Sequence, residues 1–183
     1  MARLYPPTFP HDLKKHPKRA GEHAVYCALR DALDDDWSVF YDRRIKGSRR
    51  PIDFLVIHPE RHVLALEVKG GQVHAVRGRF RQMVSRTGQR IVTTPFAQTR
   101  KALIALCRAI AIDPDTLPVH IAAFFPMMAA SAFPWADTGP HIMTREHLKP
   151  NQLRSRIKAH VAPLKRTDAK AVVAAILAAL KTR

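Results

Sequence analysis

The chain has 183 residues, of which 46% are hydrophobic and 25% charged, as expected for one globular domain with its own core. The charge is unusual, because 31 Lys and Arg residues against 15 Asp and Glu residues give a formal net charge of +16. Such an excess of positive charge favours a protein that binds a polyanion over a basic protein that has no polyanion partner. No run of about 20 apolar residues is present, which argues against a membrane span.

Residues 1–20 are rich in proline and basic residues and predict a basic N-terminal arm. Low hydrophobicity favours an arm along the domain surface, with a polyanion contact as the alternative. A helix is expected from Gly21 to Leu33, with an apolar stripe that includes Val25 and Leu29. Glu22 projects close to this stripe. It either complements the helix dipole or points towards the core, where a carboxylate needs a partner.

The next segment predicts a strand from Trp37 to Tyr41, followed by a basic loop from Asp42 to Arg50. The loop contains five cationic residues: Arg43, Arg44, Lys46, Arg49 and Arg50. Such a cluster fits a site for backbone phosphates, and a solvated charged loop is the alternative.

Two apolar runs, Ile52 to His58 and His62 to Lys69, predict neighbouring strands in the middle of a sheet. A three-residue turn between them pairs residues whose numbers sum to 120. Asp53 then lies opposite Glu67, and both share one face with Lys69. A two-residue turn would instead place the two acids on opposite faces.

Directly opposed carboxylates in an apolar sheet need a proton or a cation. A divalent metal between Asp53 and Glu67, with Lys69 beside it, meets this need. The alternative is a structural salt bridge from Lys69 to one of the two acids.

The segment from Gly70 to Ile112 contains no acidic residue. It contains eight basic ones, namely Arg77, Arg79, Arg81, Arg86, Arg90, Arg100, Lys101 and Arg108. A hairpin of residues 72–76 and 79–83 around Gly78 is expected here. This concentration of charge favours a surface that faces a polyanion.

Thr94 and Pro95 predict the start of a helix that ends before Asp113, and Val119 to Phe125 predicts a further buried strand. Gln98, in the first turns of this helix, either faces the site or occupies an ordinary polar position.

Residues 127–183 predict a C-terminal helical extension packed on the core, with a short strand at 141–143 and a helix through Leu153, Ile157 and Val161. A last helix begins at Thr167. We expect this last helix to dock on the domain, and homodimerisation through it is the alternative.

The order of helix with Glu22, strand with Asp53, strand with Glu67-Val68-Lys69, helix and strand resembles the PD-(D/E)XK nuclease superfamily. Within it, the chain is most similar to the nuclease-related domain (NERD) family. The matching motifs are Gly21-Glu22, Ile52-Asp53-Phe54, Glu67-Val68-Lys69-Gly70 and, more loosely, Pro95 with Gln98. One departure is that Pro51 does not abut the aspartate.

The resemblance implies an α/β, restriction-endonuclease-like fold over residues 21–126, with a central mixed β-sheet flanked by α-helices. It also implies hydrolysis of phosphodiester bonds with Mg²⁺ or Mn²⁺, held by Asp53, Glu67 and the carbonyl of Val68. Lys69 would orient water or a phosphate oxygen, and Glu22 would serve a second metal or a water-mediated contact. We expect nucleic acid, with DNA favoured, to contact Arg43, Arg44, Lys46, Arg49, Arg50, Arg77, Arg79 and Gln98.

Two alternatives remain beside the nuclease. One is a non-catalytic nucleic-acid-binding module that retains the nuclease fold, and the other is a basic interaction protein that uses its last helix. Cys27 and Cys107 form no metal-binding or disulfide pattern, and the N-terminus lacks the apolar region of a signal peptide, so we expect a cytoplasmic setting.

Overall fold

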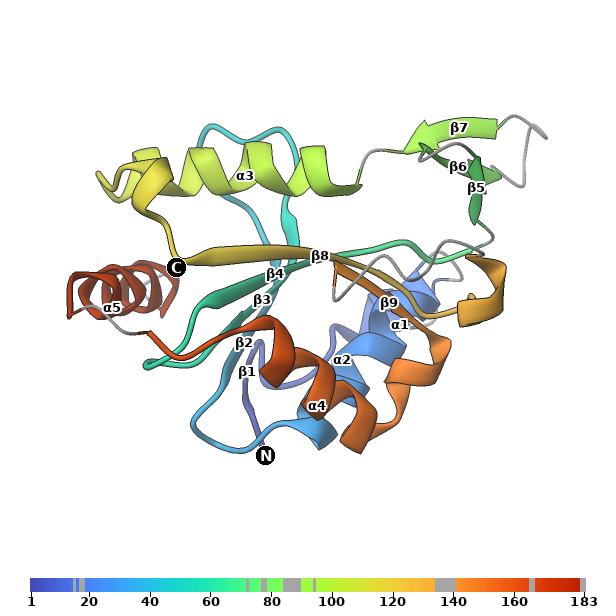
Figure 1. Cartoon of the computed structure of the whole chain (residues 1–183), viewed down its shortest axis with the longest axis horizontal. Helices are drawn as coiled ribbons and strands as arrows, with labels where there is room; N and C mark the ends of the chain where they lie inside the picture. Colours follow the sequence, from blue (N-terminus) through green and yellow to red (C-terminus); the bar gives the residue numbers. More distant parts are fainter. Residues whose placement is uncertain are drawn as a thin grey trace.

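The computed structural model describes residues 1–14, 16, 19–71, 73–76, 79–83, 90–93, 95–133, 141–164 and 167–181. These residues build a six-stranded mixed sheet with helices on both faces (Figure 1). The expected α/β fold with a central mixed sheet flanked by helices is confirmed.

The sheet has the strand order β1-β2-β3-β4-β8-β9. These strands are Arg3–Tyr5, Ser38–Arg43, Ile52–Ile57, Val63–Val68, Val119–Phe125 and Ile142–Thr144. Strand β3 is antiparallel to both of its neighbours, β2 and β4, whereas β1 is parallel to β2, β8 to β4, and β9 to β8. The apolar runs of β3 and β4 thus lie in the middle of the sheet, as predicted.

The register between β3 and β4 is the one that a three-residue turn predicts. Phe54 pairs with Leu66, Leu55 with Ala65 and Val56 with Leu64, so the paired numbers sum to 120. Continuing this register by one residue places Asp53 opposite Glu67. The two acids are therefore neighbours at the end of the hairpin away from its turn.

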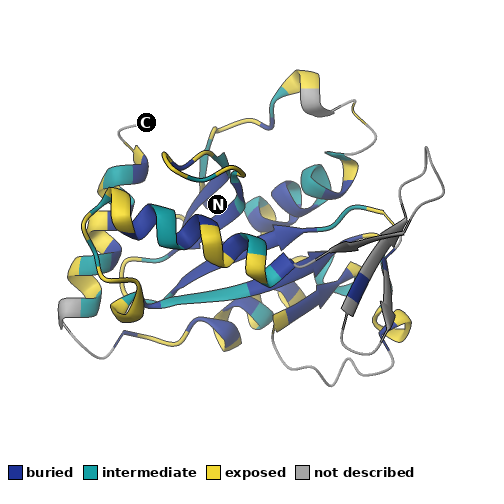
Figure 2. Ribbon diagram, turned by 90° about the horizontal axis from the view of Figure 1, so that it is seen from above, coloured by how far each residue is buried: buried dark blue, intermediate teal, exposed yellow. Residues whose placement is uncertain are grey.

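The α-helices of the described residues are α1 (His11–Lys14), α2 (Ala20–Ala32), α3 (Pro95–Ala109), α4 (Pro150–His160) and α5 (Thr167–Lys181). Short 3-10 turns lie at Pro114–Thr116, Ala130–Ala132 and Arg145–Leu148. Helices α2 and α4 cover one face of the sheet, and α3 and α5 cover the other (Figure 1). The sheet is therefore buried between two helical layers, with exposed residues on the outer sides of the helices (Figure 2).

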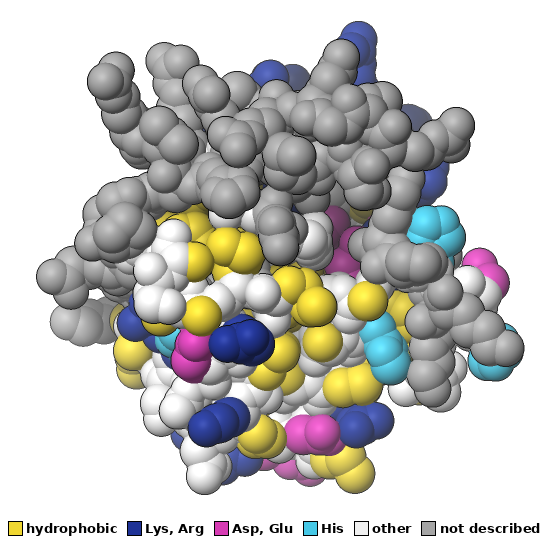
Figure 3. All heavy atoms as spheres, turned by 90° about the vertical axis from the view of Figure 1, so that its right-hand side faces the viewer, with side chains coloured by type: hydrophobic (Ala, Val, Ile, Leu, Met, Phe, Trp, Pro, Cys, Tyr) yellow, Lys and Arg dark blue, Asp and Glu magenta, His cyan; other side chains and the backbone are white. Residues whose placement is uncertain are grey.

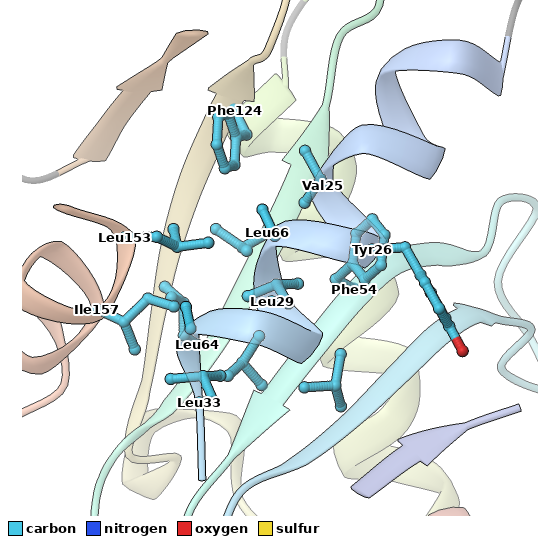
Figure 4. Packing of buried hydrophobic residues seen from close by; sticks show 14 of the residues in the cluster. Val25, Tyr26, Leu29, Leu33, Phe54, Leu64, Leu66, Phe124, Leu153 and Ile157 are labelled. Carbon is cyan, nitrogen blue, oxygen red and sulfur yellow. The ribbon is translucent and has the colours of Figure 1, made fainter. Parts of the chain in front are cut away.

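Alternation along the strands divides the core into two clusters. Leu64 and Leu66 pack under Leu29 of α2 and under Leu153 and Ile157 of α4 (Figure 4). The alternate residues of β3 and β4 point to the other face of the sheet, where they pack against α3 and α5. This second cluster includes Leu55, Ile57, Val63 and Ala65 of the strands, Leu103 of α3, and Val173 and Ile176 of α5. Asp53 and Glu67 continue this second set, so their shared face follows from the period of two in a strand.

A second, three-stranded sheet precedes α3. It consists of β5 (Val73–Val76), β6 (Arg79–Met83) and β7 (Arg90–Thr93) in the order β5-β6-β7. The predicted hairpin is present, with Val76 paired to Arg79. Its turn residue Gly78 and the predicted helix cap Thr94 lie outside the described residues. Strand β7 is not part of the sequence prediction.

The ends of the chain add to the main sheet. Residues 3–5, in the predicted arm, form the edge strand β1, and the ring of Tyr5 stacks on Phe40 with ring centroids 4.6 Å apart. Residues 142–144, in the predicted extension, form the opposite edge strand. The division into arm, core and extension stays a prediction. Among the described residues, no helix combines the length and apolar character needed to cross a bilayer.

Candidate active site

The four candidate catalytic residues line one pocket of about 220 Å³. Asp53 comes from β3, Glu67 from the end of β4, Lys69 from the residues after β4, and Glu22 from the first turn of α2. The full lining is Arg19, Glu22, Arg50, Pro51, Asp53, Glu67, Val68, Lys69 and Gln98. The fold thus brings together residues that are up to 79 positions apart in the chain.

Close packing of the first turn of α2 brings Glu22 to this pocket. A Cβ atom on Gly21 would lie 3.1 Å from Cα of Gly70 and 3.0 Å from Cγ of Pro126. A side chain at position 21 would therefore push the helix away from the segment that follows Lys69. Glycine here allows α2 to approach the end of β4.

Two side chains hold the carboxylate of Glu22. The hydroxyl of Tyr41 donates to Oε2 at 2.6 Å, and the guanidinium of Arg19 donates to the same oxygen at 2.5 Å. Burial, and then the hydrogen bond to Glu22, raises the pKa of Tyr41, so the phenol keeps its proton. Glu22 therefore has the partners that a core-facing carboxylate needs, and its place in the first turn also suits the helix dipole.

Both oxygens of the Glu67 carboxylate are also held. The side chain of Lys69 donates to Oε1 at 2.5 Å, and the hydroxyl of Thr99 donates to Oε2 at 3.1 Å. Glu67 is 6% exposed and Thr99 is 1% exposed. The Lys69 ammonium also donates to Oε1 of Gln98 at 3.2 Å, so Gln98 faces the site.

The second acid, Asp53, has a main-chain partner. The amide of Val68 donates to Oδ2 of Asp53 at 2.8 Å, across the gap between β3 and β4. Burial, and then the nearby charge of Glu67, raises the pKa of Asp53 to about 8. Without a cation, the pocket therefore favours the protonated form of Asp53.

The ion pair between Lys69 and Glu67 is the one that the salt-bridge alternative expects. A buried ion pair is weak evidence for a stabilising role, because desolvation offsets much of the attraction. Lys69 pairs with Glu67 and Arg19 pairs with Glu22, but the pocket contains Asp53 as a third acid. A structural salt bridge does not require this second carboxylate opposite Glu67.

The donor set suits a hard divalent cation. Mg²⁺ is usually bound through one or two carboxylates, with waters and phosphate oxygens in the other positions. Asp53 and Glu67 provide two carboxylates in one pocket, and Val68 also lines it. Over the described ranges, no group of three or more His, Cys, Asp or Glu side chains is arranged to hold a metal by itself. A cation held by the two carboxylates of this pocket would have coordination positions left for water and substrate oxygens.

The predicted basic residues divide into three groups. Arg50 lines the pocket itself, and Arg49 and Arg50 line an adjoining hollow of about 510 Å³. Arg43 and Arg44 line a different hollow beside the C-terminal half of α3 and α5, and the Arg43 guanidinium lies 5.3 Å from the centre of the Phe40 ring.

The remaining members of the predicted basic set are less directly placed. Lys46 is exposed in the loop between β2 and β3. Arg79 lies in β6, but its side chain is not described, and Arg77 lies outside the described residues.

Three residues of the pocket and its surroundings are not among the predicted site residues. They are Arg19, Tyr41 and Thr99. Thr99 does leave a signal, because it is a polar residue on the same helical face as Ala102, Leu103 and Leu106. A buried polar residue in an apolar stripe needs a hydrogen-bond partner, which here is Glu67.

A model of the nuclease-related domain family matches residues 17–126, which is more than half of the chain. The match includes every residue that lines the pocket. It confirms the resemblance inferred from the motifs, and the mixed sheet between helices is consistent with a nuclease-like domain. None of the curated proteins and none of the solved structures compared with the chain matches it.

Proposed function

The chain belongs to the nuclease-related domain family, and we propose that it is a metal-dependent nuclease that hydrolyses phosphodiester bonds, with DNA as the expected substrate. One observation carries the proposal. Asp53 and Glu67, opposed on neighbouring strands, open on one pocket together with Lys69.

Asp53, Glu67 and the carbonyl of Val68 would hold Mg²⁺ or Mn²⁺. A cation bound there would lower the pKa of a bound water and neutralise charge that develops on the phosphate. Its binding requires Asp53 to release the proton that the metal-free pocket favours.

Lys69 is the candidate to orient the attacking water or a phosphate oxygen. Its ammonium donates hydrogen bonds to Glu67 and Gln98, which hold it in the pocket beside the two acids. A hydrogen-bond donor that is already held in place stabilises the transition state more than a mobile donor, because it need not reorganise during the reaction.

Glu22 and two arginines complete the proposed site. Glu22 is held by Tyr41 and Arg19 and is the candidate for a water-mediated contact or a second metal. Arg19 and Arg50 also line the pocket, and guanidinium groups suit phosphate oxygens.

A cleavage assay tests the proposal. Wild type and Glu67→Ala are incubated with plasmid DNA, linear DNA and RNA, with Mg²⁺ or with EDTA. We expect wild type to cleave DNA only with Mg²⁺ and Glu67→Ala to lose nearly all activity. Glu60→Ala, which removes an exposed acid in the turn between β3 and β4, is the matched control and should retain activity. Equal behaviour of wild type and Glu67→Ala would rule the proposal out.

The same assay separates the nuclease from a non-catalytic binding module. Such a module would bind nucleic acid without cutting it. Its affinity would fall by about 10³–10⁵ between 50 and 200 mM salt if it makes 6–10 phosphate contacts. Binding of this kind with no cleavage under any metal condition would favour the module.

A further inference from the structure

We propose that Arg49 and Lys101 bind nucleic-acid phosphates in the hollow beside the acidic pocket, so that the strand leaves the pocket along the N-terminal half of α3. The lining of this hollow is Gly47, Ser48, Arg49, Arg50, Gln98 and Lys101. Cleavage of the strand in the adjoining pocket rests on the proposed function, whereas phosphate binding in the hollow does not.

The hollow and the acidic pocket adjoin each other. Arg50 and Gln98 line both of them, so a ligand that extends out of one enters the other. The hollow has a volume of about 510 Å³, against about 220 Å³ for the acidic pocket. It has room for a backbone segment next to the phosphate that the acids would face.

The described residues that line the hollow carry charges of one sign. They include the cations Arg49, Arg50 and Lys101, and none of them is acidic. Arg49 and Lys101 are exposed. The hollow therefore complements a polyanion, and the acids of the neighbouring pocket are left to the metal.

The loop that carries Arg49 has internal hydrogen bonds. The hydroxyl of Ser48 donates to the carbonyl of Arg50 at 2.7 Å, and the amide of Arg50 donates to Oγ of Ser48 at 3.3 Å. Gly47, with a φ of 86°, adopts a left-handed conformation that favours glycine. These features hold Arg49 in a turn opposite Lys101, which reduces the entropy lost on binding.

The basic surface continues along α3. The loop between β2 and β3, drawn in cyan, passes over this helix (Figure 1). Beyond the hollow, Arg43 and Arg44 lie beside the C-terminal end of α3, in a second hollow that Asp42 also lines. From Gln98 to Ala109 the helix rises about 17 Å, or roughly five base-pair steps. In contrast, the face shown in Figure 3 has basic, acidic and hydrophobic side chains interspersed among its described residues.

The lining also indicates which part of a nucleic acid the hollow would contact. None of its described lining residues is aromatic, so none of them has a ring on which a base could stack. Arginine, lysine and serine side chains are typical contacts to phosphate and sugar, which carry no sequence information. The proposed ligand is therefore the backbone of a nucleic acid of any sequence.

A binding measurement without divalent ions tests the inference. Fluorescence anisotropy of a short labelled DNA duplex is recorded in EDTA, between about 50 and 200 mM salt, for wild type, Arg49→Ala and Lys101→Ala. Each lost phosphate contact should weaken binding about fivefold at 0.15 M salt and lower the slope of log K against log salt by about 0.9. Duplexes of scrambled sequence should bind wild type within about twofold of one another.

Lys158→Ala is the matched control, because Lys158 is an exposed lysine on α4, on the opposite face of the sheet. It should bind like wild type. Circular dichroism and thermal unfolding establish that each variant is folded. If Lys101→Ala and Arg49→Ala keep the affinity and the salt slope of wild type, the inference is wrong.

The outcomes for the hollow and for the nuclease are distinguishable. If the two variants bind more weakly and wild type does not cleave, phosphate binding in the hollow is supported and the proposed nuclease activity is refuted. If wild type cleaves in a metal-dependent way and both variants bind like wild type, the nuclease activity is supported and phosphate binding in the hollow is refuted.

Discussion

Thr99 is the residue that couples α3 to the acid pair. Its hydroxyl donates to Oε2 of Glu67 and is also 3.2 Å from the carbonyl of Pro95. Since the Lys69 ammonium occupies the other oxygen of Glu67, the carboxylate is fixed from two sides. Thr99 acts through Glu67, and we regard it as a positioning residue.

Replacing Thr99 by Val removes this hydrogen bond while nearly keeping the shape of the side chain. A hydrogen bond to a charged group contributes about 1.5–3 kcal/mol, so we expect the cleavage rate of Thr99→Val to fall by at least about tenfold. Steady-state cleavage with saturating Mg²⁺ measures the effect. Thr99→Ser, which keeps the hydroxyl, should restore most of the rate. A Ser variant as slow as the Val variant would show that packing, and not the hydrogen bond, matters.

Asp53 gives the metal-free protein a distinctive pH dependence. The unfolded chain loses this proton near pH 3.8, whereas the folded chain keeps it up to about pH 8. Between these values the folded state binds more protons, so its stability falls as the pH rises. We expect Asp53→Asn to be more stable than wild type at pH 8 in EDTA, and the difference to shrink towards pH 5.

Urea unfolding in EDTA at pH 5 and pH 8 measures this difference. Asp35→Asn, at an exposed position, is the control and should follow wild type. Added Mg²⁺ should stabilise wild type and not Asp53→Asn, because only the native site binds the ion. An Asp53→Asn protein that is less stable than wild type at pH 8 would contradict the burial of an ionisable acid here.

At the scale of single elements, four histidines meet near the starts of β4, β8 and β9 and the end of α4. Nδ1 of His62 lies 2.8 Å from Nε2 of His120, and the ring centroid of His160 lies 5.3 Å from that of His120 and 5.1 Å from that of His141. His160 is 4% exposed. Burial, and then the charges of His120, His141 and Arg156, lowers the pKa of His160 to about 4.

This histidine should make the protein acid-sensitive. The unfolded chain takes up a proton at His160 near pH 6.5 and the folded chain only near pH 4, so stability falls as the pH drops through this window. We expect His160→Leu to lose less stability than wild type between pH 7 and pH 5, by on the order of 2 kcal/mol, in urea unfolding. His11→Leu, at an exposed position, is the control. An unchanged pH dependence in His160→Leu would contradict the prediction.

The elements that the sequence predicts well are those whose pattern is local. The turn at Pro59-Glu60-Arg61 and the apolar runs beside it predict the register that places Asp53 opposite Glu67, and the structure has this register. The stripe of α2 and the start of α3 at Pro95 are also confirmed. Each depends on residues within a few positions of one another.

The partners within the site are not local. Tyr41 lies 19 residues from Glu22, and Thr99 lies 32 residues from Glu67. Their contacts depend on how α2 and α3 dock on the sheet, which periodicity alone does not specify. Strand β1, with three residues, is too short to show alternation. The contacts of Tyr41 and Thr99 and the strand β1 could be identified only from the three-dimensional structure.

At the scale of the whole molecule, the two helical layers hold the sheet and thereby the acid pair. Leu29 of α2 is fully buried against Leu64 and Leu66 (Figure 4). Leu29→Ala should lower the free energy of unfolding by about 2–5 kcal/mol, because it leaves a cavity, whereas Leu29→Met should cost less than about 1.5 kcal/mol. Chemical denaturation measures both. Equal losses in the two variants would mean that the position is not tightly packed.

The outer helix α5 belongs to this layer as well. Val173, Ile176 and Leu180 of α5 are buried in the cluster that includes Leu55 and Leu103. Homodimerisation through this helix stays a prediction. It would require the exposed face of α5, and the oligomeric state in solution would reveal it.

The central claim is that Asp53 and Glu67 converge on one divalent metal. The most direct test is a crystal of the protein soaked in Mn²⁺ and measured at a wavelength where manganese scatters anomalously. The claim predicts an anomalous peak within about 2.0–2.6 Å of carboxylate oxygens of both residues, and no such peak in Glu67→Ala. A fully soaked wild-type crystal without a peak between the two acids would contradict it.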